Sequence, residues 1–220
     1  MTEEARAFGY LTQPEIRFLD AAVERLIPAD ELGPGAKEAG VACFIDQQLA
    51  SVWGSHGRNY RAGPWPEGTP QQGFQSRLTP REIYRAAIRE VNVHCLNQFR
   101  KAFEFLAPRE QDEVLKGLES GAIELPSLSS KLFFGLLLRN AMEGYFADPI
   151  YGGNRNKAGW RLIGFPGVPA SSYNDLIDEH NVPYRVEPVS ILDIQQGKVK
   201  LDSQGLPKHA RLKDEGRNGR

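Results

Sequence analysis

The chain has 220 residues, of which 40% are hydrophobic and 25% charged, which suits one domain with a real core. Its formal net charge of −1 gives no overall positive field, so we expect no nucleic acid partner. No apolar run reaches the roughly 18 residues that cross a bilayer, and residues 1–10 are acidic and lack the apolar stretch of a secretory signal.

Two amphipathic helices are predicted near the N-terminus. The first begins at Thr12, which forms a capping box with Glu15, and it ends before Pro28. Apolar residues at helical spacing predict the second helix over residues 41–52. Both helices have a polar opposite face, so each is expected to bury one side only.

A long segment without periodicity, residues 54–78, follows the second helix. Glycine and proline are frequent in it. The aromatic residues Tyr60, Trp65 and Phe74 lie within it, and Trp53 directly precedes it. A loop of this length is unusual in a compact domain unless it is functional or disordered, and its aromatic content argues against disorder. It either covers its own helical bundle or forms an interface arm, a segment that contacts a partner protein. The sequence does not distinguish these two interpretations.

A second capping box, at Thr79, predicts a long helix whose apolar set continues to Leu106, before Pro108. A short helix then covers residues 114–118, and Gly121 is placed to cap its C-terminus.

The next helix is predicted to be the central one of the bundle, because it is apolar nearly all round. Ser129 or Ser130 caps its N-terminus, and the Asp148-Pro149 pair ends it.

Residues 148–167 form the most distinctive segment of the chain. Gly152 and Gly153 permit a sharp turn with positive φ. Around them stands a dense polar and aromatic set: Asp148, Tyr151, Asn154, Arg155 and Trp160. One interpretation is a binding loop in which Arg155 forks onto a carboxylate. The favoured interpretation is a self-bracing or partner-facing loop, in which polar side chains bond nearby backbone, Arg155 pairs with an acid and Trp160 fills the core.

Beyond this segment we expect a short helix over residues 157–163, a weak helix over 172–179, and an extended chain after residue 183 that ends in a polar tail. The predicted fold class is therefore all-α. It is a small helical bundle with two long ordered irregular segments and an extended C-terminal tail.

Catalytic, cofactor-binding and metal-binding motifs are missing from the sequence. The four histidines are far apart, there is no Gly-x-Gly-x-x-Gly turn after a strand and no Gly-x-Ser-x-Gly elbow, and Cys43 and Cys95 lie in no metal or haem pattern. We therefore expect no catalytic residue, no metal and no cofactor in this chain. The two cysteines are interpreted as buried small apolar residues, with a disulfide as the alternative.

Two stretches resemble a known family. Residues 18–41 have the sequence FLDAAVERLIPADELGPGAKEAGV, and residues 148–167 contain DPIYGGN followed by GWRLIGFPG. Together with residues 60–80 they resemble the gluconate 2-dehydrogenase subunit 3 family. The resemblance spans roughly residues 10–190, which we take as the subunit 3-like helical domain, and leaves 191–220 as the extended polar C-terminal tail.

This resemblance implies a non-catalytic small subunit. Its expected partners are a large FAD-dependent flavoprotein of the glucose–methanol–choline type, which oxidises a sugar or sugar acid such as gluconate, and a cytochrome c subunit that carries haem c. The small subunit would stabilise and escort the flavoprotein. The complex would be periplasmic, with membrane association only through the complex.

The family supplies no catalytic residues for this chain. Its motif matches Tyr151, Gly152, Gly153, Asn154, Arg155 and Trp160, which with Asp148 we predict to be a partner-interface or structural loop. Trp53, Tyr60, Trp65 and Phe74 are a candidate interface arm. The alternatives are an autonomous sugar-acid-binding enzyme that uses the Asp148–Arg155 loop, and a transient export chaperone that releases its client.

Overall fold

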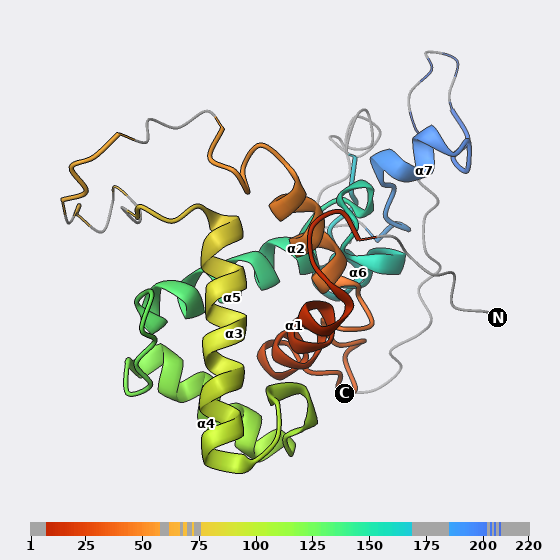
Figure 1. Cartoon of the computed structure of the whole chain (residues 1–220). Helices are drawn as coiled ribbons and strands as arrows, with labels where there is room; N and C mark the ends of the chain where they lie inside the picture. Colours follow the sequence, from red (N-terminus) through yellow and green to blue (C-terminus); the bar gives the residue numbers. More distant parts are fainter. Residues whose placement is uncertain are drawn as a thin grey trace.

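The computed structural model describes residues 8–57, 62–66, 68–69, 72, 76–168, 185–201, 203, 205 and 207. Within these residues the chain forms helices and isolated β-bridges and no β-strand, so the predicted all-α class is confirmed (Figure 1). The α-helices are α1 (Gln13–Leu26), α2 (Val41–Ala50), α3 (Pro80–Phe99), α4 (Pro108–Ser120), α5 (Ser130–Phe146), α6 (Ala158–Ile163) and α7 (Ile191–Gln195). Three short 3-10 turns, η2 (Phe103–Phe105), η3 (Pro149–Tyr151) and η4 (Arg155–Lys157), join them.

Both predicted capping boxes are present. The backbone N–H of Thr12 donates to the Glu15 carboxylate at 2.7 Å, and that of Thr79 donates to the Glu82 carboxylate at 2.8 Å. The first N–H groups of a helix have no partner inside it, so these reciprocal contacts fix where α1 and α3 begin. The predicted C-terminal cap of α4, Gly121, adopts the left-handed conformation at φ 81°.

The helix α3 ends earlier than predicted. The apolar pattern had indicated a helix as far as Leu106, but α3 stops at Phe99, and Arg100 takes a left-handed conformation at φ 62°. The chain turns there to bury Phe103, whose N–H donates to the Asn92 side chain at 3.0 Å and whose ring lies 4.7 Å from that of Phe18. Burial of this ring in the core outweighs continuation of the helix.

The predicted central position of α5 is confirmed, because α5 contacts α1, α2, α3, α4 and α6. Ser129 caps it by accepting the Leu132 N–H. Its burial is nevertheless one-sided, since Leu138 is 38% exposed and Met142 is 46% exposed. An apolar outer face therefore remains uncovered on α5.

One apolar core joins the helices. Tyr84 on α3 lies at its centre with no exposed surface; its hydroxyl donates to the Asn140 carboxamide on α5 at 2.8 Å, and its ring meets Phe133 edge-on. Burial raises the pKa of Tyr84 far above its ordinary value. The other large side chains that are fully buried are Phe18, Phe103, Leu19, Ile45, Leu49, Ile83, Leu118, Leu137, Val23 and Val41.

The N-terminal segment is fastened to α2 by Asp46, a carboxylate only 3% exposed. It accepts three successive backbone N–H groups: Gly9 at 2.6 Å, Tyr10 at 3.0 Å and Leu11 at 2.7 Å. A buried carboxylate needs such donors, so these bonds determine how the chain enters α1.

The predicted excursion over residues 54–78 is described only in part. Its described residues 62–66 and 68–69 are exposed or half-buried, and they lie away from the helices (Figure 1). The predicted helix over residues 172–179 lies outside the described residues.

Candidate functional site

The segment 148–167 begins where α5 ends, and Asp148 organises its first turn. One carboxylate oxygen of Asp148 accepts the Ile150 N–H at 3.0 Å, and the other accepts the Ile191 N–H at 2.8 Å. Both oxygens therefore hold backbone, one in η3 and one in α7. Such a carboxylate braces the loop.

The two glycines let the loop lie directly on the helices below it. A Cβ on Gly153 would lie 2.2 Å from the Gly144 carbonyl oxygen of α5, and one on Gly152 would lie 2.7 Å from the side-chain amide of Gln47 on α2. Gly152 also has φ 91°, which L side chains rarely adopt. Gly153 is thus required by the close approach of the loop to the α5 backbone, and Gly152 by its positive φ.

Asn154 has no exposed surface and is left-handed at φ 46°. Its carboxamide donates to the Ala147 carbonyl oxygen at 2.8 Å and accepts the Gly159 N–H at 2.9 Å. Asparagine tolerates this backbone conformation better than most residues, so one side chain both permits the turn and satisfies two buried backbone groups.

Arg155 crosses the N-terminus of α2. Its backbone N–H donates to the Ala39 carbonyl oxygen at 2.9 Å, and its Nη2 donates to the Cys43 sulfur at 3.2 Å. The buried Nε has no hydrogen-bond acceptor and lies 2.5 Å from where a Cβ of Gly40 would be. The expected pairing of Arg155 with an acid is not found among the described residues and stays a prediction. The side chain passes over Gly40 toward Cys43 instead.

Trp160 fills the core, as predicted. It is 5% exposed, its indole N–H donates to the Phe146 carbonyl oxygen at 2.7 Å, and its ring meets Phe165 edge-on with centroids 5.2 Å apart. Tyr151 points outward and is 51% exposed. The predicted short helix over residues 157–163 is confirmed as α6.

Residues 185–201 cover one side of this segment, a contact that the sequence did not predict. Val189 and Gly167 form a parallel bridge, and the Val168 N–H donates to the Val189 carbonyl oxygen at 2.8 Å. Lys157 reaches Asp193 at 2.9 Å, and Arg161 pairs with Glu187.

The helix α7 corrects the prediction that the chain after residue 183 is extended. Its N-terminus is a capping box in which the Asp193 carboxylate accepts from both the N–H and the hydroxyl of Ser190. Burial acts to raise the pKa of Asp193, but the bonds from Ser190 and Lys157 outweigh it and hold the pKa below its ordinary value. The spacing of Ser190 and Asp193 is the sequence signal that could have identified this helix.

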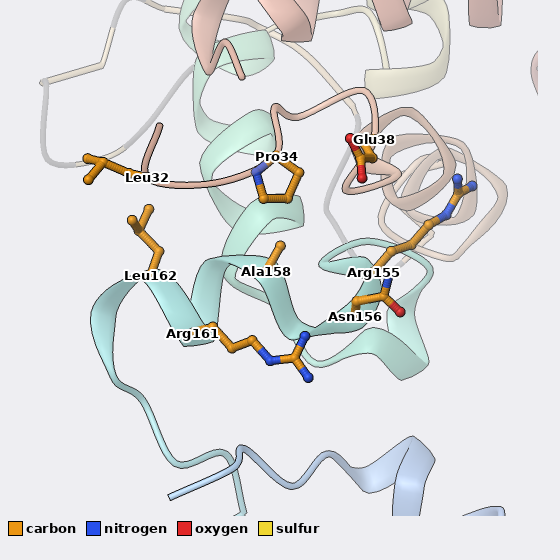
Figure 2. A pocket seen from close by; sticks show the side chains of 8 residues that line it. All are labelled: Leu32, Pro34, Glu38, Arg155, Asn156, Ala158, Arg161 and Leu162. Atoms are coloured by element: carbon orange, nitrogen blue, oxygen red, sulfur yellow. The ribbon is translucent and has the colours of Figure 1, made fainter. Parts of the chain in front are cut away.

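A cavity of about 460 Å³ lies beside the segment, between the loop that follows α1 and the helix α6 (Figure 2). Its lining residues are Leu32, Pro34, Glu38, Arg155, Asn156, Ala158, Arg161 and Leu162. Of the residues predicted to form a binding loop, only Arg155 reaches it; Tyr151, Trp160 and Asp148 do not line it. The structure therefore does not gather the predicted polar and aromatic set around one pocket.

The candidate interface arm is described only in part. Trp53 lies just after α2 and is 36% exposed, and Trp65 is half-buried beside Gly63 of its own loop. Tyr60 and Phe74 lie outside the described residues. The role of the arm stays a prediction.

Neither cysteine is part of a disulfide. Cys95 is fully buried, and burial, followed by the charge of Glu104, raises the pKa of its thiol to about 12. Cys43 is half-buried against Arg155.

No group of three or more histidine, cysteine or acidic side chains that could hold a metal occurs among the described residues. None of the described helices is both long and apolar enough to cross a membrane.

The family model described as Gluconate 2-dehydrogenase subunit 3 matches residues 13–167, more than half of the chain. The match runs from the first residue of α1 to the glycine that bridges Val189. No curated protein and no solved structure matches the chain at a significant level.

Proposed function

Because the chain belongs to the gluconate 2-dehydrogenase subunit 3 family, we propose that it is a non-catalytic small subunit of a heteromeric, FAD-dependent sugar or sugar-acid dehydrogenase. In this proposal the large subunit is a flavoprotein of the glucose–methanol–choline type that binds FAD and oxidises the substrate. The small subunit stabilises the flavoprotein and accompanies it during export to the periplasm.

The observation that carries the proposal is the extent of the family match. It covers the helical core and the whole of segment 148–167, and hydrogen bonds from Asn154 and Trp160 join this segment to the end of α5. Membership of a family of subunits implies a partner in a multi-subunit dehydrogenase.

The construction of segment 148–167 supports a structural or partner-facing role over an active site. Asp148 and Asn154 are occupied by backbone groups, Trp160 is in the core, and Arg155 is turned toward Cys43. An active site on this loop would bring such groups together around a substrate. This arrangement favours the subunit role over the autonomous sugar-acid-binding enzyme.

A cytochrome c subunit with haem c, which passes electrons to the membrane quinone pool, completes the proposed complex. The complex lies in the periplasm and is attached to the membrane through its other subunits. FAD and haem c belong to the partners in this proposal.

The test is affinity purification of the tagged chain from its native host, with partner masses and an absorption spectrum of the eluate. We expect a stable complex with a flavoprotein of the glucose–methanol–choline type, flavin absorption, and haem c bands in the same fraction. Recovery of the chain as a monomer that does not bind this flavoprotein at micromolar concentration contradicts the proposal. A complex that forms and then dissociates during flavoprotein maturation identifies a transient chaperone instead.

A further inference from the structure

Residues 185–201, which we call the C-terminal strap, cover one side of segment 148–167 and lie beyond the residues that the family model matches. Two backbone hydrogen bonds join Val189 of the strap to the end of the segment. The Val189 N–H donates to the Pro166 carbonyl oxygen at 3.0 Å, and the Val189 carbonyl oxygen accepts the Val168 N–H at 2.8 Å. A third bond joins the first N–H of α7 to the carboxylate that organises the first turn of the segment.

The strap buries little apolar surface. Val186, Pro188 and Val189 are its buried apolar residues, whereas no residue of α7 is buried and Ile191 is 40% exposed. The three buried residues lie outside the apolar core that joins α1 to α5. Burial of apolar area supplies most of the stability of a fold, so a region with so few buried side chains opens at a lower free energy than the core.

Four charged side chains supply much of the remaining attachment, and they alternate in sign. Asp193 pairs with Lys157 at 2.9 Å, Lys157 lies 3.6 Å from Glu187, and Glu187 also pairs with Arg161. Both acids belong to the strap, and both cations belong to segment 148–167. Within the part of the chain that the structure describes, every acid that forms an ion pair with either cation therefore lies on the strap.

The two ends of this row of charges differ in exposure. The side chains of Lys157 and Asp193 are 15% and 19% exposed, whereas those of Glu187 and Arg161 are 37% and 50% exposed. Dissolved salt screens exposed pairs strongly and partly buried pairs less. Salt should therefore weaken the Glu187 end of the strap first, and it should have little effect on the apolar core.

We propose that the C-terminal strap is a charge-held cover that opens and closes on segment 148–167 while the helical core stays folded. Closed, the strap keeps the cations Lys157 and Arg161 paired with its own acids. Open, it leaves both cations and the Asp148 carboxylate accessible, with Arg161 at the edge of the cavity between the loop after α1 and the helix α6. The strap thus controls access to this side of the segment, and this inference does not depend on the proposed function.

The experiment is native-state amide hydrogen exchange of the full chain at about 0.05 M and about 0.5 M salt. The N–H groups of Val189 and Ile191 report on the strap, and that of Leu137, a fully buried residue of α5, reports on the core. We expect the strap amides to exchange faster than Leu137 at both salt concentrations. The higher concentration should raise their exchange by about threefold and leave Leu137 unchanged.

The variant Glu187→Gln keeps the size of the side chain and removes the charge that meets both cations. At low salt we expect it to raise exchange at the two strap amides by about fivefold, and to raise acetylation of the Lys157 ammonium in parallel. The thermal midpoint of the core should not change. Glu119→Gln is the matched control, because Glu119 is an exposed residue of α4 outside the strap, and it should behave like the unmodified chain.

Three outcomes would overturn the inference. Strap amides that exchange only at the rate of Leu137 would show that the strap is a fixed part of the fold. Fast exchange that neither salt nor Glu187→Gln alters would show that charges do not hold the strap closed. Faster amide exchange with unchanged acetylation of Lys157 would show that opening does not release the cations.

Discussion

The carboxamide of Asn154 donates a hydrogen bond to the carbonyl oxygen of Ala147, 2.8 Å away and seven residues earlier in the chain. The same side chain accepts the Gly159 N–H. One buried asparagine thus joins the C-terminal cap of α5 to the first turn of α6, and it determines the shape of the segment that the family match includes.

The substitution Asn154→Ala removes both hydrogen bonds and leaves two buried backbone groups without partners. It also places alanine at φ 46°. We expect a loss of about 3 kcal/mol in the free energy of unfolding, since an unsatisfied buried group costs roughly 1–3 kcal/mol. Urea unfolding gives the value. Asn156→Ala is the control, because Asn156 has φ 56° but is exposed, so only the backbone cost of about 1 kcal/mol remains. Equal losses for the two variants would contradict the account.

Gly153 and Gly135 make a second matched pair. A Cβ on Gly153 would meet the Gly144 carbonyl oxygen at 2.2 Å, whereas a Cβ on Gly135 of α5 would have nothing within 4 Å. We expect Gly153→Ala to destabilise the chain by more than about 3 kcal/mol, because backbone on both sides must move. Gly135→Ala should stabilise it by about 0.5–1 kcal/mol through helix propensity. Thermal unfolding distinguishes the two, and a tolerated Gly153→Ala would show that the segment does not pack on α5 in this way.

The buried carboxylate of Asp46 predicts a local effect at the N-terminus. Asp46→Ala leaves the N–H groups of Gly9, Tyr10 and Leu11 without their acceptor. We expect a loss of about 2–4 kcal/mol and faster amide exchange over residues 9–11. Asp46→Asn keeps one acceptor oxygen and should fall between the alanine variant and the unmodified chain. Unchanged exchange at these amides in Asp46→Ala would rule out this anchoring role.

The contact between Lys157 of η4 and Asp193 of α7 should depend on pH. Its pKa lies below the ordinary value of 3.8, because the bonds from Ser190 and Lys157 outweigh the effect of burial. A carboxylate with a lowered folded pKa stabilises the protein above its unfolded pKa, and that contribution disappears as pH falls through the folded value. The neighbouring charges Glu187 and Arg161 belong to the same group of ion pairs.

We therefore expect the unmodified chain to exceed Asp193→Asn by about 1–2 kcal/mol at neutral pH, through the cap and the ion pair. The difference should shrink as the pH falls below 3.8, where the unfolded carboxyl becomes protonated, and should be lost once the pH falls through the lower folded pKa. Urea midpoints for both proteins across this range provide the measurement. A difference that grows on acidification would refute the assignment.

The helical framework could be predicted because its determinants are local. Thr12 with Glu15, Thr79 with Glu82 and Gly121 are short-range capping signals, and each appears in the structure where the sequence indicated it. The central position of α5 followed from its apolar composition, since such a helix can only be satisfied by contacts with many neighbours.

The remaining features depend on contacts between distant residues. The early end of α3 is caused by Phe103 packing against Phe18, which periodicity along α3 does not reveal. The contact of Arg155 with Cys43 was not predicted, because the Arg155 side chain passes over Gly40, more than a hundred residues earlier in the chain. Likewise, the docking of α7 on Lys157 joins residues 36 positions apart.

The cavity beside Leu32 and Leu162 also depends on residues that are distant in the sequence. Leu32 and Leu162 lie in the two stretches that resemble the family, but nothing in the sequence shows that the fold brings them together as exposed residues beside one cavity. The sequence directed attention to Tyr151 and Trp160, whereas the structure lines the cavity with Ala158, Arg161 and Leu162 of α6.

The central claim is that this chain works through a protein that carries the redox group. The most direct measurement is the absorption spectrum of the purified isolated chain, together with dye-linked oxidation of gluconate, beside the same two measurements on the complex with its flavoprotein. The account predicts no flavin or haem absorption and no gluconate oxidation for the isolated chain. It predicts cofactor absorption and gluconate oxidation for the complex. A stoichiometric flavin, haem or metal bound to the isolated chain, with substrate oxidation by that chain alone, would contradict it.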